Sequence, residues 1–205
     1  MTLKVGWATF EATKYACTHW HYSKCVPVGK MIKVGAWEDD KFIGVVVFSR
    51  GANKSLGSPY NLKQTECCEL TRVAMRPHKC FVSQVLAKAI KFLKMKCPEM
   101  KLIISYADIE QGHHGGIYQA TNWIYEGKSV ESRYFIVKGK KTHPKSLYSL
   151  YKNKYADFEQ SVDWIRRYVD KTASVYYDSG KHKYLFPLNK EMRKQVEHLA
   201  KEYPK

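Results

Sequence analysis

The segment from Glu69 to Asp108 reads ELTRVAMRPHKCFVSQVLAKAIKFLKMKCPEMKLIISYAD and alternates the signals of strands and a helix. Its middle part, Val82–Lys96, has apolar residues at helical spacing and lysines on another face, which predicts an amphipathic helix closed by Pro98. Glu69–Met75 and Leu102–Tyr106 are short and largely apolar, and they predict buried strands. A strand–helix–strand unit of this kind is typical of an α/β protein.

The segments on both sides extend the same alternation. Leu3–Ala8 predicts a strand, Glu11–His21 a helix, and Met31–Trp37 and Phe42–Phe48 two strands joined by a polar turn. Later elements are predicted as a helix at Gly115–Thr121, strands at Trp123–Tyr125 and Tyr134–Val137, a basic turn at Lys138–His143, and helices near Phe158–Val169 and Lys190–Tyr203. We therefore expect an α/β core over residues 1–137 and a basic helical C-terminal extension over residues 138–205, packed on that core.

The chain is strongly basic, with 35 Lys and Arg against 19 Asp and Glu among 205 residues, a net charge of +16. Residues 138–205 hold 16 of these cations and 8 of the anions, so this part is about twice as basic per residue as the rest. Such an excess predicts an anionic partner, nucleic acid first and an anionic membrane second. A charged face that contacts only solvent is the alternative.

The six cysteines contain no CxxC pair, so the sequence does not predict a zinc ribbon. The first residues lack the long apolar stretch of a secretory signal, and no apolar run approaches the roughly 20 residues needed to span a bilayer. We therefore expect a cytoplasmic protein with reduced thiols packed as small core residues, and no membrane partner.

Several polar residues stand where an α/β protein can bind ligands. Asp108 follows a buried strand, and there it can ligate a metal, orient a base or cap the next helix. His21 and Tyr22 end the first predicted helix, where an imidazole and a phenol can bind a metal, move protons or simply pack together. His113 and His114 precede two glycines at a helix start, which can hold an anion. Either histidine can instead bind a metal or stack on a base, and because they are adjacent we expect only one of them to point into a site.

Two sets of basic residues can bind phosphate. The turn between the central strand and helix has no glycine, but phosphate can still be held there by Arg72, Arg76, Lys79 and Ser83. The second set is predicted to contact the phosphates of DNA, with a solvated charged face as the alternative. It comprises Lys140, Lys141, His143, Lys145, Arg166, Arg167, Lys181 and Lys183.

Four segments of this chain resemble the Mom family of phage DNA-modification proteins, and the resemblance extends over nearly the whole chain. They are HWHYSK at 19–24, ELTRVA at 69–74, SYADIEQGHHGGIYQATNW at 105–123 and GKHKYLFPL at 180–188. The resemblance implies a GNAT-like acyltransferase fold with a mixed central sheet. It also implies an enzyme that converts adenine in DNA to N6-carbamoylmethyladenine, which protects phage DNA from host restriction.

The resemblance further implies a metal, iron, held by His21, Tyr22, Asp108 and Tyr118, with catalytic roles for Tyr22, Asp108 and Tyr118. A tyrosine at the position of Tyr118 can protonate a leaving group in GNAT-like enzymes. In ordinary GNAT enzymes the turn before the central helix is glycine-rich and closes on the pyrophosphate of coenzyme A. The glycine-free turn here leaves the donor open between acetyl-CoA and an aminoacyl donor such as aminoacyl-tRNA.

The adenine amine is a poor nucleophile and is paired inside double-stranded DNA, the predicted partner. The enzyme must flip the base or act on an opened strand and stack it on an aromatic ring, for which Tyr22, Trp123 and Tyr125 are candidates. Two alternatives stay open: an N-acetyltransferase acting on a small amine or RNA, and a nucleic-acid-binding module without catalysis. The sequence leaves the oligomeric state open, a homodimer included.

Overall fold

A computed structural model describes residues 1–51 and 54–205, which form two compact units. The core unit comprises Met1–Ala107, His113–Gly127 and His182–Lys205. The inserted unit comprises Asp108–Gly112 and Lys128–Lys181. The chain therefore leaves the core unit twice, once for a short loop and once for a longer segment, and each unit is described by itself.

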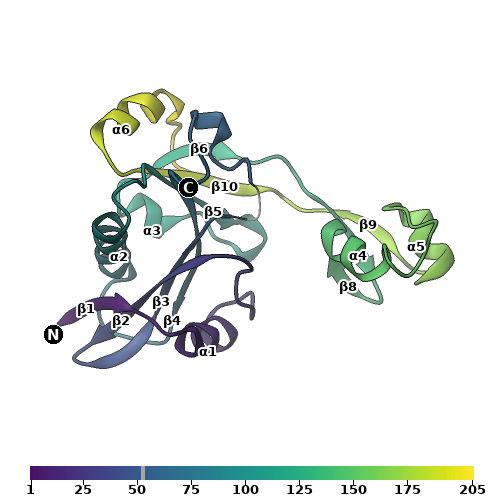
Figure 1. Cartoon of the computed structure of the whole chain (residues 1–205), viewed down its shortest axis with the longest axis horizontal. Coiled ribbons are helices and arrows are strands. Elements are labelled where there is room, and N and C mark those ends of the chain that lie inside the picture. Colours follow the sequence, from purple (N-terminus) through teal and green to yellow (C-terminus); the bar gives the residue numbers. More distant parts are fainter. Residues whose placement is uncertain (52–53) are drawn as a thin grey trace. The chain divides into compact units, whose positions relative to one another are not determined.

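A mixed seven-stranded sheet, in the order β1-β2-β3-β4-β5-β10-β6, is the centre of the core unit (Figure 1). Neighbours from β1 to β4 are antiparallel, and β4 pairs with β5 in parallel. The strands are β1 (Leu3–Trp7), β2 (Met31–Glu38), β3 (Lys41–Ser49), β4 (Cys67–Met75), β5 (Leu102–Asp108), β6 (Ile124–Lys128) and β10 (Lys181–Pro187).

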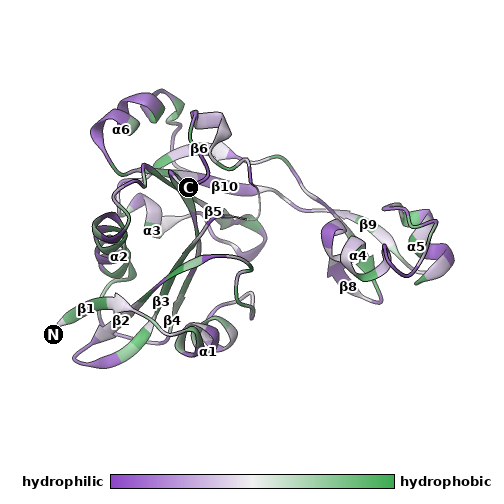
Figure 2. Cartoon of the chain, in the orientation of Figure 1, coloured by the Kyte–Doolittle hydropathy of each residue, from purple (hydrophilic) through white to green (hydrophobic). Residues whose placement is uncertain are grey.

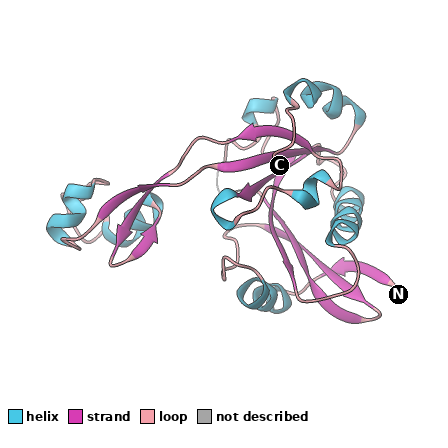
Figure 3. Ribbon diagram, turned by 180° about the vertical axis from the view of Figure 1, so that it is seen from behind, coloured by secondary structure: helices cyan, strands magenta, loops and turns pink. Residues whose placement is uncertain are grey.

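Helices pack on both faces of this sheet (Figures 1 and 3). On one face α2 (Val82–Lys96) buries Leu86 and Leu93 in the same cluster as Phe48 of β3. Each such side chain stabilises the fold by about 1.5–3 kcal/mol relative to exposure. On the other face α1 (Phe10–Trp20) buries Cys17 against β3, and α6 (Lys190–Val196) packs over β5 and β10. Figure 2 shows the hydrophobic colouring of the central strands between these helices.

Short helical segments complete the core unit and the loop after β5. They are η1 (Ser58–Tyr60), η2 (Ile109–Gln111), α3 (Gly116–Gln119) and η3 (Glu197–Leu199). α1 begins at Thr9, whose side chain accepts a hydrogen bond from the Ala12 N–H. Of these segments, α3 matters most for the site, because it carries Tyr118.

The inserted unit has its own sheet and its own core. Its three strands are antiparallel in the order β8-β7-β9, and the unit also contains two helices. Phe135 of β7 is fully buried among Leu147, Trp164 and Ile165 of those helices. The elements are β7 (Arg133–Val137), β8 (Lys140–Thr142), α4 (Pro144–Tyr151), α5 (Val162–Tyr168) and β9 (Ser174–Tyr177).

The predicted α/β class with a mixed central sheet is confirmed, and the central helix has the predicted bounds. The basic helical C-terminal extension is not what the structure shows, because β10 is a strand of the core sheet. The sequence did not predict this strand, because its first three residues, Lys181, His182 and Lys183, are basic or polar and only then do the buried Tyr184 and Leu185 follow. Residues 128–137, assigned to the predicted core, lie in the inserted unit instead.

Four of the cysteines are buried as predicted, but Cys25 is exposed in the loop after α1, so the prediction is wrong for that residue. Within the described residues, no helix is both long enough and apolar enough to cross a membrane.

The position of β10 predicts a large effect of truncating Leu185, which is fully buried beside Leu102 and Ile104. Leu185→Ala should lower the free energy of unfolding by about 2–5 kcal/mol, measured by urea denaturation. Val175→Ala, on the exposed strand β9, should change it by less than about 0.5 kcal/mol. Equal, small effects of both substitutions would contradict the placement of β10 in the core.

Candidate active site

The candidate site begins where β4 and β5 stop pairing. Their parallel ladder runs from Cys67–Leu102 to Leu70–Ser105, while β4 continues to Met75. Ser105 is fully buried, and its hydroxyl lies 2.9 Å from the Leu70 carbonyl oxygen and 2.8 Å from the Tyr118 hydroxyl oxygen. A polar group is thus fixed inside the sheet at the carboxyl end of the paired segment, where α/β proteins bind ligands.

Tyr118 reaches this point from α3, whose entry depends on a glycine. Gly115 has a φ of +85°, and a Cβ atom there would lie 2.4 Å from the Tyr184 ring. The Tyr118 ring packs between Trp123 and Tyr184, each with its centroid 4.9 Å away. Burial raises the pKa of Tyr118 to about 12. Tyr118 is therefore a neutral phenol at neutral pH and can donate a proton.

His21 lies at the end of α1 and is held as a neutral ring. Burial, followed by the positive charge of Arg72, lowers the pKa of His21 to about 4. Its Nδ1 accepts a hydrogen bond from the Ser23 N–H at 3.1 Å and lies 2.8 Å from the Ser23 Oγ. Because Nδ1 is the acceptor, the proton of the neutral ring is on Nε2. His21 thus offers an N–H donor.

Tyr22 and His113 complete the cluster around Tyr118. The Tyr22 ring lies 4.3 Å from the His21 ring and meets the His113 ring edge-to-face at 5.3 Å. Tyr22 also lies close enough to Tyr118 to raise the pKa of Tyr118 further. Tyr22 is 46% exposed, so it is the part of the cluster that a substrate can reach. The imidazole of His114 is exposed, and its backbone carbonyl accepts the Tyr184 hydroxyl.

Arg72 belongs to this cluster and not to the turn before α2. Its guanidinium donates to the carbonyl oxygens of Thr71 at 2.7 Å and Cys25 at 3.3 Å. From this position the charge of Arg72 adds to the effect of burial in lowering the pKa of His21. Arg76, in turn, lies over the Trp20 ring at 6.0 Å. Two of the four predicted phosphate-binding residues thus make contacts with the first helix or the loop after it.

The backbone of the turn before α2 is occupied by a carboxylate. Glu38, at the end of β2, accepts hydrogen bonds from the Lys79 N–H at 3.1 Å and the Cys80 N–H at 2.7 Å. Both hydrogen bonds lower the pKa of Glu38, and the one from the Lys79 N–H has the larger effect. An acidic side chain of the protein therefore takes the N–H groups that would otherwise face a bound anion.

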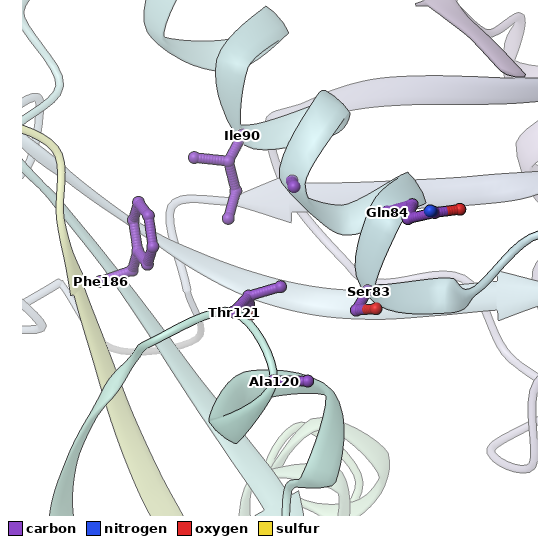
Figure 4. A pocket seen from close by; sticks show the side chains of 7 residues that line it. Ser83, Gln84, Ile90, Ala120, Thr121 and Phe186 are labelled. Atoms are coloured by element: carbon purple, nitrogen blue, oxygen red, sulfur yellow. The ribbon is translucent and has the colours of Figure 1, made fainter.

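Ser83, the fourth predicted phosphate-binding residue, lines a cleft of about 350 Å³ beside the N-terminal half of α2 (Figure 4). None of the seven lining residues carries a charged side chain; they are Ser83, Gln84, Ala87, Ile90, Ala120, Thr121 and Phe186. A pyrophosphate would find neither cations in this cleft nor available N–H groups at Lys79 and Cys80. The site does not fit the pyrophosphate of coenzyme A.

Iron at His21, Tyr22, Asp108 and Tyr118 stays a prediction. His21, Tyr22 and Tyr118 lie in the core unit, whereas Asp108 belongs to the inserted unit. A bound cation would itself favour the deprotonated form of a ligand such as Tyr118. Across residues 1–51 and 54–205, no three His, Cys, Asp or Glu side chains are grouped to hold a metal ion.

Asp108, the remaining predicted ligand and catalytic residue, belongs to the inserted unit. Its carboxylate accepts the Glu110 N–H at 3.1 Å, which caps η2, and lies 3.7 Å from the Lys181 ammonium. The capping role, one of the alternatives left open by the sequence, is therefore present. A catalytic role for Asp108 stays a prediction.

The predicted DNA-contacting residues are divided between the two units. Lys183 lies in the core unit, where its ammonium is 3.0 Å from the Glu126 carboxylate and 5.2 Å from the Tyr60 ring centroid. The other seven lie in the inserted unit. There His143 caps α4, and Arg166 donates to the Ala173 carbonyl oxygen at 2.8 Å. Six residues of the set are exposed to solvent: Lys140, Lys141, His143, Lys145, Arg166 and Arg167.

Sequence reasoning missed Ser105 and Glu38. Ser105 carried a usable signal, because it is a hydroxyl at the end of an otherwise apolar strand, Leu102–Ile104. Glu38 carried none, since it meets Lys79 across 41 positions of sequence.

The mixed sheet with its diverging β4–β5 pair and tyrosine-bearing α3 defines a GNAT-like α/β fold. An N-acetyltransferase from Staphylococcus aureus Mu50 has the same fold with a TM-score of 0.50 and 11% identity, covering 92% of this chain and 99% of that one. A probable acetyltransferase from Staphylococcus epidermidis ATCC 12228 is similar at a TM-score of 0.49 and 7% identity, covering 92% and 100%. At 11% identity, the similarity to the Staphylococcus aureus enzyme shows the fold alone.

The chain belongs to the Mom protein family, which it matches over residues 2–205. A curated relative, the methylcarbamoylase mom of Escherichia phage Mu, is 23% identical over 180 residues. That alignment covers 86% of this chain and 71% of the relative. The family resemblance inferred from the four sequence segments is thus confirmed.

The low pKa of His21 predicts a loss of stability in acid. Between pH 6.5 and about 4 the unfolded chain binds a proton at His21 and the folded protein does not, so stability falls by up to about 3 kcal/mol across this range. His21→Asn keeps an acceptor for the Ser23 N–H and removes the titration. Urea denaturation at several pH values should therefore give a shallower pH dependence for this variant. An unchanged slope would contradict a buried neutral His21; His198→Asn, at an exposed histidine, is the control.

The Glu38 contact predicts no saturable binding of coenzyme A to the wild-type protein in isothermal titration calorimetry. Glu38→Ala removes the carboxylate from the Lys79 and Cys80 N–H groups, so weak binding should appear only in this variant. Glu66→Ala, which breaks the ion pair of Glu66 with Lys101 elsewhere, should behave like wild type. Micromolar binding of coenzyme A to the wild-type protein would contradict the prediction.

Proposed function

We propose that this protein is a GNAT-like transferase that modifies DNA, converting adenine to N6-carbamoylmethyladenine and so protecting phage DNA from host restriction. The proposal rests on the buried, neutral Tyr118 hydroxyl at the end of the β4–β5 ladder. Near it lies the exposed ring of Tyr22, which in turn packs against His21. Membership of the Mom family supports the choice of DNA as substrate.

The chemistry assigned to Tyr118 is proton transfer. With a glycyl donor, the first step breaks one N6–H bond of adenine, forms a bond between N6 and the donor's carbonyl carbon, and releases the ester oxygen with a proton. The resulting N6-glycyladenine is an isomer of N6-carbamoylmethyladenine, so a rearrangement must follow. It breaks the bonds from N6 to the carbonyl carbon and from the amine to the methylene carbon, and it forms bonds from N6 to the methylene carbon and from the amine to the carbonyl carbon. Tyr118 supplies the proton of the first step, and the proton lost from N6 restores the phenol. A pKa near 12 keeps Tyr118 protonated before the reaction and makes it a suitable acid for a basic leaving group.

The other residues position the base. Trp123 and Tyr125 are buried, at 1% and 8% exposure, so Tyr22 is the candidate ring on which a flipped adenine can stack. The Nε2–H of His21 can donate to an oxygen or ring nitrogen of the bound reactants. These neutral donors are fixed before substrate arrives, which is the arrangement that stabilises charge developing in a transition state.

The donor is proposed to be one that needs no pyrophosphate site, because Glu38 occupies the N–H groups of Lys79 and Cys80. An aminoacyl donor such as aminoacyl-tRNA satisfies this condition better than acetyl-CoA. Both units can attract a polyanion, since the core unit holds 23 Lys and Arg against 11 Asp and Glu and the inserted unit 12 against 8.

The test is Tyr118→Phe, which removes the phenol and keeps the ring. DNA from cells that express the protein is digested to nucleosides, and the modified deoxyadenosine is measured by mass spectrometry. Tyr118→Phe should lower the modified fraction by about 10²-fold or more, because general acid catalysis contributes that much. Tyr125→Phe, in the same aromatic cluster and hydrogen-bonded to His182, should retain modification.

Two results would contradict the proposal. Full modification by Tyr118→Phe would remove Tyr118 from the chemistry. Unmodified DNA in cells that express the wild-type protein, together with tight DNA binding, would favour a binding module without catalysis.

A further inference from the structure

The small sheet of the inserted unit has one face that its helices do not cover. Phe135 and Val137 of β7 point to α4 and α5, so the alternating residues Tyr134 and Ile136 point to the opposite face. Tyr134 is paired directly with Tyr176 of β9, and Ile136 with Lys141 of β8. Directly paired residues share a face, so Tyr134, Lys141 and Tyr176 lie together there.

Lys141 lies between the two tyrosine rings. Its ammonium is 4.3 Å from the centroid of the Tyr134 ring and 4.6 Å from that of Tyr176. The same ammonium contacts one carboxylate oxygen of Glu110 at 2.5 Å, and the Tyr176 hydroxyl donates to the other oxygen. Both hydrogen bonds lower the pKa of Glu110, and the one from Lys141 has the larger effect. Glu110 is therefore held as an anion on the cation of this face.

Glu110 comes from the loop between β5 and α3. This loop, Asp108–Gly112, belongs to the inserted unit, where Asp108 also approaches Lys181 at 3.7 Å. It immediately precedes His113, which contacts Tyr22. Two carboxylates of one loop thus meet two lysines of the inserted unit, next in sequence to the candidate active site.

The chemistry of the face is that of a nucleic-acid contact. A lysine neutralises a phosphate, and tyrosine rings stack on bases, each stacked base being worth about 1–3 kcal/mol. Glu110 places a carboxylate where a phosphate oxygen would meet Lys141. We propose that Tyr134, Lys141 and Tyr176 form a nucleic-acid-binding surface that Glu110 closes, so that a phosphate binding at Lys141 displaces Glu110 and releases the Asp108–Gly112 loop. This inference rests on the proposed function, because it takes the DNA substrate as the ligand.

The experiment measures the affinity of a fluorescent oligodeoxynucleotide, single-stranded and as a duplex, by anisotropy at several salt concentrations. Glu110→Gln keeps the shape and removes the charge, so Lys141 becomes available to phosphate. The dissociation constant should fall by about tenfold, and the slope of log K against log salt should steepen by about one. Asp163→Asn is the matched control, because Asp163 is an exposed acid of the same unit that is likewise paired with a cation, Arg166 at 3.7 Å, but on α5 and not on this face. Its effect should stay within about threefold.

Lys141→Met in the Glu110→Gln background should abolish the gain, since the released ammonium is its cause. Tyr176→Phe removes one hydrogen bond to Glu110 and keeps the ring, so it should give a smaller gain; this variant also serves if Glu110→Gln does not fold. Equal effects of Glu110→Gln and Asp163→Asn would overturn the proposal. So would a gain that survives Lys141→Met, or an equal gain of affinity for anionic phospholipid vesicles.

Failure of this inference can be told from failure of the proposed function. If the wild-type protein modifies DNA but Glu110→Gln binds no better than Asp163→Asn, the inference fails and the function stands. If Glu110→Gln shows the expected gain but no modified deoxyadenosine is formed by the wild-type protein, the function fails and the binding surface stands.

Discussion

The candidate site depends on the point at which β4 and β5 stop pairing. Beyond Leu70 and Ser105 the two strands no longer share a ladder, and the Leu70 carbonyl takes its hydrogen bond from the Ser105 hydroxyl instead. A buried carbonyl without a partner would cost about 1–3 kcal/mol. The same hydroxyl fixes Tyr118, so one side chain both ends the ladder and positions the proposed acid.

Carboxylates of the protein itself occupy two of the places where the sequence predicted phosphate. Glu38 takes the N–H groups of the turn before α2, and Glu110 takes the ammonium of Lys141. The net charge of +16 therefore overstates the number of open phosphate sites. The Glu38 contact occupies the turn before α2 and argues against a pyrophosphate-bearing donor. Glu110 lies on the short helical segment η2 and contacts Lys141, the cation that a competing anion would take from it.

Local pattern predicted the regular elements well and the non-local contacts poorly. The bounds of α2 followed from the spacing of Leu86, Ile90 and Leu93, because a buried face alone sets that period. β10 was missed since Lys181 and Lys183 flank its start, and only the fold shows that Lys183 meets Glu126. His21 and Tyr118 were found by resemblance, but their protonation could not be, because it arises from burial and from neighbours distant in sequence.

A positively charged protein whose active-site side chains are neutral is suited to acting on a polyanion. A protonated His21 or a phenolate at Tyr118 would interact with substrate charge before any reaction. A phenolate at Tyr118 would also have no proton to donate in acid catalysis. Arg72 contributes to the neutrality, since its fixed charge opposes protonation of His21 while adding to the positive field that attracts DNA. Attraction is thus supplied by residues that do no chemistry, and the proton donors stay in the single protonation state that the proposed transfer requires.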